Sequence, residues 1–197
     1  HVHARHTNDG YIKHNYKLKD IFFTPEHLKN KSVSIDELLF GFLKQKANKV
    51  DVKVVDSMRN AEVHGEAFDL VSLNVARGRD HGLPDYLKLR NHFGGKPVYD
   101  WYDITKNNEV AYKLKQLYGV NGWNNVDLFI GLAAEDKYPG SHFGYTLHHI
   151  IKDQFKRLMS GDAYFYLWDS DLSYDKDDIH KTTLKDVILR NTNINHL

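Results

Sequence analysis

The stretch from Asp69 to Tyr86 reads DLVSLNVARGRDHGLPDY, and it says more about the fold than any other part of this 197-residue chain. On a helix, four of its residues fall at positions i, i+3, i+4 and i+7, namely Leu70, Leu73, Asn74 and Arg77. An apolar stripe therefore carries a neutral amide and, one turn later, a guanidinium on the same face. The helix is predicted to stop in the charged, glycine-containing run 77–82.

The polar groups of this stripe need partners. A buried Asn74 must find hydrogen-bond partners, and a half-buried Arg77 favours a carboxylate or phosphate that it can bind through two hydrogen bonds. One interpretation is an internal network, in which Asp80 neutralises Arg77 or Arg79. The other is that the stripe forms one wall of a pocket for a flat, apolar ligand with an acidic edge.

Outward from this stretch, capping residues and apolar residues three or four positions apart predict further helices. Helices capped by Ser34, Asn107 and Thr183 are expected, and Pro84 is expected in the first turn of another. The predicted helices and buried apolar segments cover about residues 35–43, 84–89, 107–117, 126–132, 141–159 and 183–188. Residues 1–16 are predicted to form a polar loop with a turn at residues 8–10. The expected architecture is one mainly α-helical body with long loops.

The composition excludes several classes of protein. Lys and Arg number 27 against 26 Asp and Glu, so the net charge of +1 indicates neither nucleic-acid binding nor a polybasic membrane anchor. Hydrophobic residues make up 41% of the chain, which excludes wholesale disorder, and no contiguous apolar run predicts a membrane span. The absence of Cys excludes disulfide scaffolds, Cys-ligated metals and thiol nucleophiles.

Three imidazoles fall within the first six residues, at His1, His3 and His6. Their spacing resembles the H-x-H-x-D-H cluster of zinc hydrolases, in which His and Asp side chains hold the metal. Arg5, however, occupies the place of the Asp, and its positive charge would repel a metal ion. Solvated loop histidines are the favoured interpretation, with a zinc hydrolase as the alternative.

Residues 73–86 closely resemble the LN-x-x-RGRDHGLP-x-Y signature of the animal-type heme peroxidases, the peroxidase–cyclooxygenase superfamily. Four more segments resemble family stretches in the same order, namely residues 17–25, 35–41, 126–135 and 154–162. The resemblance covers about residues 17–195. It implies a mainly α, animal heme peroxidase-like helical fold with long loops, in which residues 1–197 form the C-terminal part of a single heme peroxidase domain. The N-terminal half of that domain is then absent from this chain.

The resemblance also implies a heme b cofactor. In the family, the Asn matching Asn74 accepts the Nδ1 proton of the proximal His that ligates the iron, and the Arg matching Arg77 approaches a heme propionate. Leu70 and Leu73 are then expected to pack near the porphyrin. The turn 79–81 is expected to hold the end of the helix by ion pairing.

Other functional groups of the family are expected outside this chain. The distal His and Arg, which deprotonate peroxide and polarise its O–O bond, lie upstream in the family, as do the calcium site and the carboxylates that esterify heme. No catalytic residue is therefore assigned here. The axial His is expected a few residues before His1, and the alternative is that His1 itself ligates the iron.

The predicted function is a heme-dependent peroxidase that uses hydrogen peroxide to oxidise a small-molecule or fatty-acid donor. This chain alone is expected to lack turnover. Two alternatives remain, a fatty-acid dioxygenase of the same superfamily and a peroxidase-like adhesion or interaction protein that has lost the chemistry. The resemblance favours a secreted or extracellular protein that takes part in the response to oxidative stress.

Overall fold

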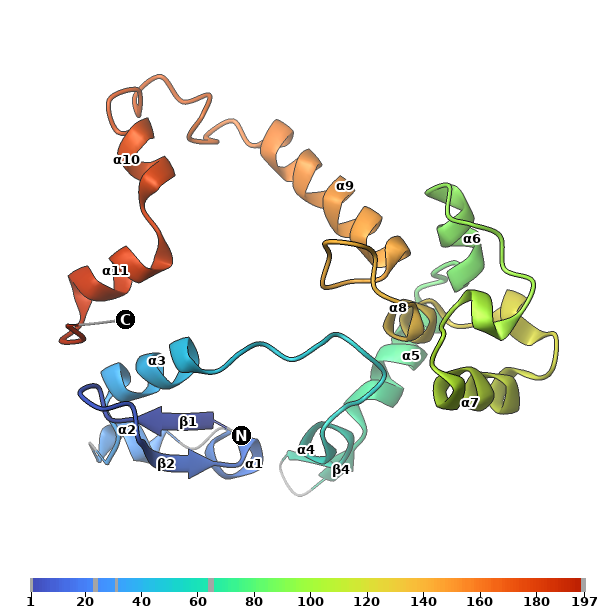
Figure 1. Ribbon diagram of the computed structural model, residues 1–197, viewed down its shortest axis with the longest axis horizontal. Helices are drawn as coiled ribbons and strands as arrows, with labels where there is room; N and C mark the ends of the chain where they lie inside the picture. Colours follow the sequence, from blue (N-terminus) through green and yellow to red (C-terminus); the bar gives the residue numbers. More distant parts are fainter. Residues whose placement is uncertain (1, 23–24, 31, 64–65, 196–197) are drawn as a thin grey trace. The chain divides into compact units, whose positions relative to one another are not determined.

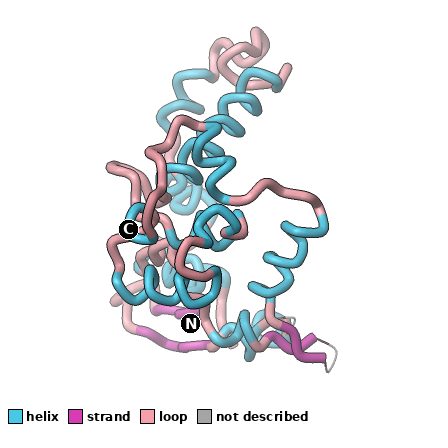
Figure 2. Tube along the Cα trace, turned by 90° about the vertical axis from the view of Figure 1, so that its right-hand side faces the viewer, coloured by secondary structure: helices cyan, strands magenta, loops and turns pink. Residues whose placement is uncertain are grey.

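The computed structural model describes residues 2–22, 25–30, 32–63 and 66–195. The chain divides into two compact units, a first unit of residues 1–48 and 162–197 and a second unit of residues 49–161. Both are mainly helical (Figures 1 and 2), which confirms the predicted fold class. Among the described residues, no helix has both the length and the apolar character needed to cross a lipid bilayer.

The first unit contains a β-hairpin and a set of helices. Strand β1 (Val2–Arg5) pairs antiparallel with strand β2 (Ile12–Tyr16), and the connecting turn includes Gly10 at φ +77°. The helices of this unit are α1 (Leu18–Ile21), α2 (Glu26–Lys29), α3 (Ile35–Lys44), α10 (Lys176–Lys181) and α11 (Leu184–Asn191).

The prediction of a polar loop over residues 1–16 is wrong, because residues 2–16 form this hairpin. Packing against α3 explains the difference. Ala4 on β1 is fully buried, and Gly41 of α3 lies against the same strand. A Cβ atom added to Gly41 would overlap the carbonyl oxygen of His3. The hairpin therefore depends on a tertiary contact, which the local sequence pattern does not reveal.

Capping in the first unit follows the prediction. Ser34 Oγ accepts a hydrogen bond from the Glu37 N–H at 3.1 Å, and the Glu37 carboxylate accepts one from the Ser34 N–H at 2.9 Å. This reciprocal pair starts α3 at Ile35, and Thr183 starts α11 in the same way. The core of the unit consists of Phe40, Ile188 and Ile194.

The second unit is built from short helices around one core. In chain order its elements are α4 (Asp56–Arg59), the antiparallel strands β3 (Ala61–Val63) and β4 (Glu66–Phe68), α5 (Leu70–Asp80), α6 (Tyr86–His92), the 3-10 turn η1 (Trp101–Asp103), α7 (Asn108–Tyr118), the 3-10 turn η2 (Gly122–Asn125), α8 (Leu128–Ala134) and α9 (Tyr145–Gly161).

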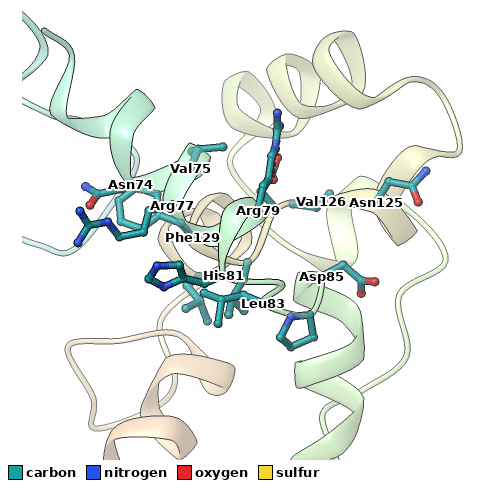
Figure 3. Close-up of a pocket in the computed structure, with 15 residues that line it drawn as sticks. Asn74, Val75, Arg77, Arg79, His81, Leu83, Asp85, Asn125, Val126 and Phe129 are labelled. Atoms are coloured by element: carbon teal, nitrogen blue, oxygen red, sulfur yellow. Dashed lines mark hydrogen bonds and ion pairs between the residues drawn. The ribbon is translucent and has the colours of Figure 1, made fainter.

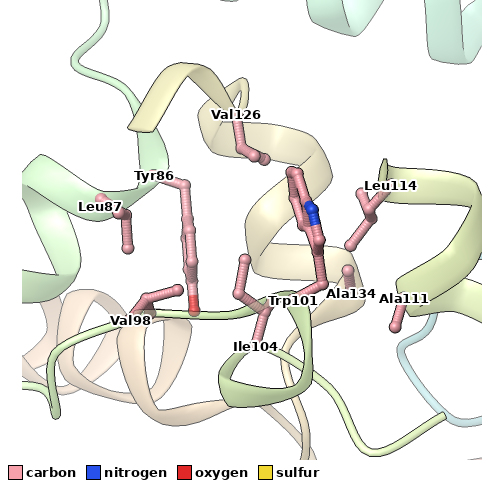
Figure 4. Packing of buried hydrophobic residues seen from close by; sticks show 9 residues of the cluster. All are labelled: Tyr86, Leu87, Val98, Trp101, Ile104, Ala111, Leu114, Val126 and Ala134. Atoms are coloured by element: carbon pink, nitrogen blue, oxygen red, sulfur yellow. The ribbon is translucent and has the colours of Figure 1, made fainter. Parts of the chain in front are cut away.

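The core of the second unit lies between α6, α7 and α8 (Figure 4). Its buried members are Tyr86, Leu87, Val98, Trp101, Ile104, Ala111, Leu114, Val126 and Ala134. The predicted burial of residues 126–132 holds for Val126, whereas Phe129 stays 40% exposed. The predicted α7 is also confirmed, with Asn107 as its N-cap, although its residue Leu117 is 77% exposed.

A buried polar network joins three elements of this unit. The carboxylate of Glu135 accepts hydrogen bonds from Arg90 Nη1 at 2.6 Å, from the Tyr86 hydroxyl at 2.9 Å and from the Thr146 N–H at 2.7 Å. Arg90 and Glu135 are 7% and 3% exposed. Burial, reinforced by the nearby Glu135 charge, raises the pKa of Tyr86, so its hydroxyl remains a protonated donor. The network ties α6 to the end of α8 and to the start of α9.

Two predicted helix starts are wrong. Helix α6 begins at Tyr86 because the Asp85 carboxylate accepts the Lys88 N–H at 2.9 Å and so acts as the N-cap, which leaves Pro84 outside the helix. Helix α9 begins at Tyr145 and not at Ser141. The preceding residues instead form a local turn, in which Gly140 has φ +74° and the Tyr138 N–H donates to the Phe143 carbonyl at 2.9 Å.

Gly131 of α8 offers a test of this packing. A Cβ atom at this position would overlap the Tyr86 side chain, which is fully buried and hydrogen-bonded to Glu135. We expect Gly131→Ala to lower the free energy of unfolding by about 1–3 kcal/mol through overpacking, measured by urea denaturation. Gly161→Ala is the matched control, because no atom lies within 4 Å of its added Cβ. Equal stability of the two variants would contradict the packing described here.

Candidate functional site

Helix α5 starts at a well-formed N-cap. The Asp69 carboxylate accepts hydrogen bonds from the N–H groups of Val71 and Ser72 and from the Ser72 hydroxyl. Desolvation tends to raise the pKa of Asp69, but these hydrogen bonds outweigh it and lower the pKa below its usual value. The helix ends at Asp80, within the run 77–82 as predicted.

The two sides of α5 have different surroundings. Val71, Val75 and Gly78 are partly buried, and Val75 and Gly78 border the same pocket as Phe129 and Leu132 of α8. The predicted stripe lies on a neighbouring side of the helix, and two of its members, Asn74 and Arg77, also reach this pocket. Leu70 and Leu73 are 38% and 51% exposed. The leucines of the stripe therefore remain partly exposed, whereas Val71, Val75 and Gly78 form the more buried side of α5.

Asn74 and Arg77 are exposed, and both extend to the same side of α5 (Figure 3). Neither side chain makes a hydrogen bond or ion pair with any residue that the structure describes. The interpretation that Asp80 neutralises Arg77 or Arg79 is wrong, because Arg79 binds Asp127 and Arg77 has no acidic partner within the described ranges. The guanidinium of Arg77 is thus available to a carboxylate from outside this part of the chain.

A pocket of about 380 Å³ lies between α5, the loop that follows it and α8 (Figure 3). Leu83, Phe129 and Leu132 are among the apolar residues that line it. Asn74 and Arg77 also line it, whereas Leu70 and Leu73 do not. The pocket is therefore apolar inside, with an amide and a guanidinium on the side formed by α5.

Arg79 points away from Arg77 and binds α8. Its Nε and Nη2 atoms each donate a hydrogen bond to the Asp127 carboxylate, both at 2.8 Å. The Tyr118 hydroxyl of α7 donates to the same carboxylate at 2.8 Å. This confirms the expectation that the turn 79–81 is held by ion pairing, but the acidic partner lies 48 residues away in the sequence.

The charges of this cluster are stabilised by one another. Hydrogen bonds from Arg79 and Tyr118 hold the pKa of Asp127 below its usual value in spite of partial desolvation. Desolvation and the neighbouring carboxylate raise the pKa of Tyr118 to about 12. Asp127 is therefore ionised and Tyr118 protonated at neutral pH.

Sequence reasoning did not single out Asp127 or Tyr118. Asp127 lies in one of the segments that resemble the peroxidase family, but its partner is far away in the sequence. The available signal was an Asp directly before the apolar run 128–132, a typical N-cap position. In the structure that carboxylate makes no capping hydrogen bond and binds Arg79 instead.

The histidine cluster of the sequence gives no metal site among the residues that the structure describes, since no three His, Asp or Glu side chains come together there as ligands. His3 lies on β1, and His6 follows that strand. His1, the alternative axial ligand, lies outside the described residues, so its role stays a prediction.

The whole chain, residues 1–197, matches the family model described as "Animal haem peroxidase". The chain therefore belongs to the animal haem peroxidase family, as its motifs predict. It is 34% identical over 152 residues to Peroxinectin A of Dictyostelium discoideum, an alignment that covers 76% of this chain and 28% of that protein.

Solved structures agree with this assignment. Peroxidase A from Dictyostelium discoideum matches 100% of this chain with a TM-score of 0.86 at 30% identity, over 38% of its own length. A fatty acid alpha-dioxygenase from Oryza sativa matches 96% of this chain with a TM-score of 0.82 at 19% identity, which is a likeness of fold alone. The chain thus spans between 28% and 38% of the length of Peroxinectin A and Peroxidase A.

The Arg79–Asp127 pair predicts a pH dependence of stability. Because the pKa of Asp127 is lower in the folded protein than its usual value of 3.8, the pair stabilises the fold above that value, and its contribution is lost as the pH falls through the folded pKa. We expect Asp127→Asn to have a lower Tm than the wild type near neutral pH, and this difference to shrink below about pH 3.8.

Thermal unfolding followed by circular dichroism over this acid range checks the expectation. Asp153→Asn is the control, because its ion pair with Arg157 is exposed on both sides and contributes little. A Tm difference between Asp127→Asn and the wild type that stays constant down to the most acidic pH would contradict the assigned role of this carboxylate.

Proposed function

We propose that this chain is the C-terminal part of a heme-dependent peroxidase and that α5 supplies one side of the heme site. The observation that carries the proposal is the exposed side of α5, where Asn74 and Arg77 stand beside Leu70 and Leu73 without partners in the described part of the chain. In a member of the animal haem peroxidase family, this surface is available to a heme group.

The residues present fit such a group by their chemistry. A porphyrin is flat and apolar and carries two acidic propionates. It therefore matches an apolar stripe that ends in Arg77, whose guanidinium has no acidic partner among the described residues. Arg77 would bind a propionate through charge-assisted hydrogen bonds. Leu70 and Leu73 would cover the porphyrin edge and keep water away from it.

Asn74 has a separate role in this proposal. Its amide oxygen would accept the Nδ1 proton of the axial His, which lies outside the described residues, and would fix the orientation of that ring and raise its basicity. When bound, heme supplies an iron that hydrogen peroxide oxidises by two electrons and that a donor returns to its resting state in two one-electron steps. The distal His and Arg that assist the peroxide are assigned to the part of the protein upstream of His1.

Both structural units belong to one domain in this proposal. The match to the family model extends over residues 1–197 and so includes both units. Residues 1–197 would then form the C-terminal part of a single heme peroxidase domain. Peroxidase is favoured over fatty-acid dioxygenase because the chain is 30% identical to Peroxidase A, against 19% for the rice dioxygenase.

Substitutions on α5 test the proposal. We expect Arg77→Ala and Asn74→Ala, made in the protein expressed from its complete coding sequence, to weaken heme retention by about 10–100-fold, the range for loss of an outer-shell partner. Asn74→Ala should also change the ferric/ferrous potential. Hemin titration followed at the Soret band and spectroelectrochemistry make the two measurements.

Lys113→Ala is the control, since Lys113 makes only an exposed ion pair with Glu109 on α7. Heme retention and potential equal to wild type in both α5 variants would show that the roles assigned to Asn74 and Arg77 are wrong. A protein that binds heme but shows no Soret change and no donor oxidation with hydrogen peroxide would favour a member of the family that has lost the chemistry.

A further inference from the structure

The Asp127 carboxylate connects three helices at the edge of the pocket. It precedes α8, accepts two hydrogen bonds from Arg79 of α5 and one from Tyr118 of α7, all at 2.8 Å. The side chain of Asp127 is 15% exposed, whereas that of Arg79 is 68% exposed. The carboxylate is therefore the fixed part of the cluster, and the arginine reaches it from the helix surface.

This cluster is the main polar anchor of the second half of α5. Within the described part of the chain, residues 73–80 make no other side-chain hydrogen bond or ion pair. Other contacts of that half include the apolar lining that Val75 adds to the pocket and a hydrogen bond from the Leu83 N–H to the Gly78 carbonyl at 3.0 Å. Apolar packing is not directional, so it limits rotation of the helix about its axis less than two parallel hydrogen bonds do.

The helix geometry links this anchor to Arg77. Residues two positions apart on an α-helix lie about 200° apart around its axis. Holding Arg79 against Asp127 on one side therefore directs Arg77 to nearly the opposite side. Asn74 is one helical turn before Arg77 and lies on the same face, so any rotation of the helix about its axis redirects both side chains together.

We infer that Asp127, with Tyr118 behind it, is a positioning residue for Arg77 and Asn74. It touches neither group, but it sets the rotation of the last turns of α5 and so the direction in which the guanidinium and the amide face their ligand. Tyr118 contributes by holding the carboxylate in place through the third hydrogen bond. This inference rests on the proposed function, because the ligand of Arg77 and Asn74 is taken to be heme and its axial His.

The test compares Asp127→Asn with Asp136→Asn in the protein expressed from its complete coding sequence and loaded with hemin. The two changes are chemically identical. Asp136 accepts two hydrogen bonds, from the Thr105 hydroxyl at 2.9 Å and the Lys106 N–H at 2.8 Å, and neither donor belongs to α5. The measurements are the affinity for hemin, followed at the Soret band during loading, and the ferric/ferrous potential.

We expect Asp127→Asn to weaken hemin binding severalfold and to shift the potential in the same direction as Arg77→Ala. The double variant Asp127→Asn/Arg77→Ala should lose less than the sum of the two single effects, because both changes act in part through the Arg77 guanidinium. Asp127→Glu should restore part of the effect, and Asp136→Asn should leave both measurements unchanged.

Tyr118→Phe is a second variant that removes fewer interactions than Asp127→Asn. It removes one hydroxyl from a half-buried ring and should produce a smaller effect of the same sign, even if Asp127→Asn unfolds the protein. Wild-type hemin affinity and potential in Asp127→Asn and Tyr118→Phe, combined with a clear effect of Arg77→Ala, would overturn this inference and leave the proposed function standing. No effect of Arg77→Ala would overturn both.

Discussion

The buried ion pair between Arg90 and Glu135 is the contact on which the second unit depends. Removing two charges from water is costly, and the cost is offset only when every polar atom finds a partner. Here Tyr86, Thr146 and the Lys96 carbonyl supply the remaining hydrogen bonds. This network has room because two neighbouring positions, Gly131 and Gly144, carry no side chain. A Cβ on Gly144 would lie 2.5 Å from the Glu135 carboxylate, and one on Gly131 would overlap Tyr86.

Helix α8 carries this constraint to the candidate site. Its C-terminal end is held by Glu135, and the residue before its first turn, Asp127, binds Arg79. Between these two anchors, Phe129 and Leu132 line the pocket next to α5. A short helix with polar contacts at both ends thus determines where α5 lies and which of its sides stays open.

The open side of α5 accounts for the composition of that helix. Two leucines, an amide and a guanidinium on one face stay exposed in the described part of the unit, and an exposed apolar stripe of this kind commonly marks a binding surface. The proposed ligand, heme, has an apolar plane and an acidic edge that match these groups, and membership of the animal haem peroxidase family supports this proposal. The surface and the family assignment support each other, although they rest on different observations.

Much of the local structure could be predicted from the sequence, because it depends on interactions between near neighbours. The caps at Ser34, Asn107 and Thr183, the helical stripe from Leu70 to Arg77 and the family signature act over a few residues each. The partner of Arg79, the hairpin at residues 2–16 and the late start of α9 could not be predicted in this way. Arg79 and Asp127 are 48 residues apart, and nothing in either local sequence favours this pairing over the adjacent Asp80. Only the packing of α5 on α8 brings the two charges within hydrogen-bond distance, so the tertiary structure alone decided which side of α5 is anchored and which is free to bind.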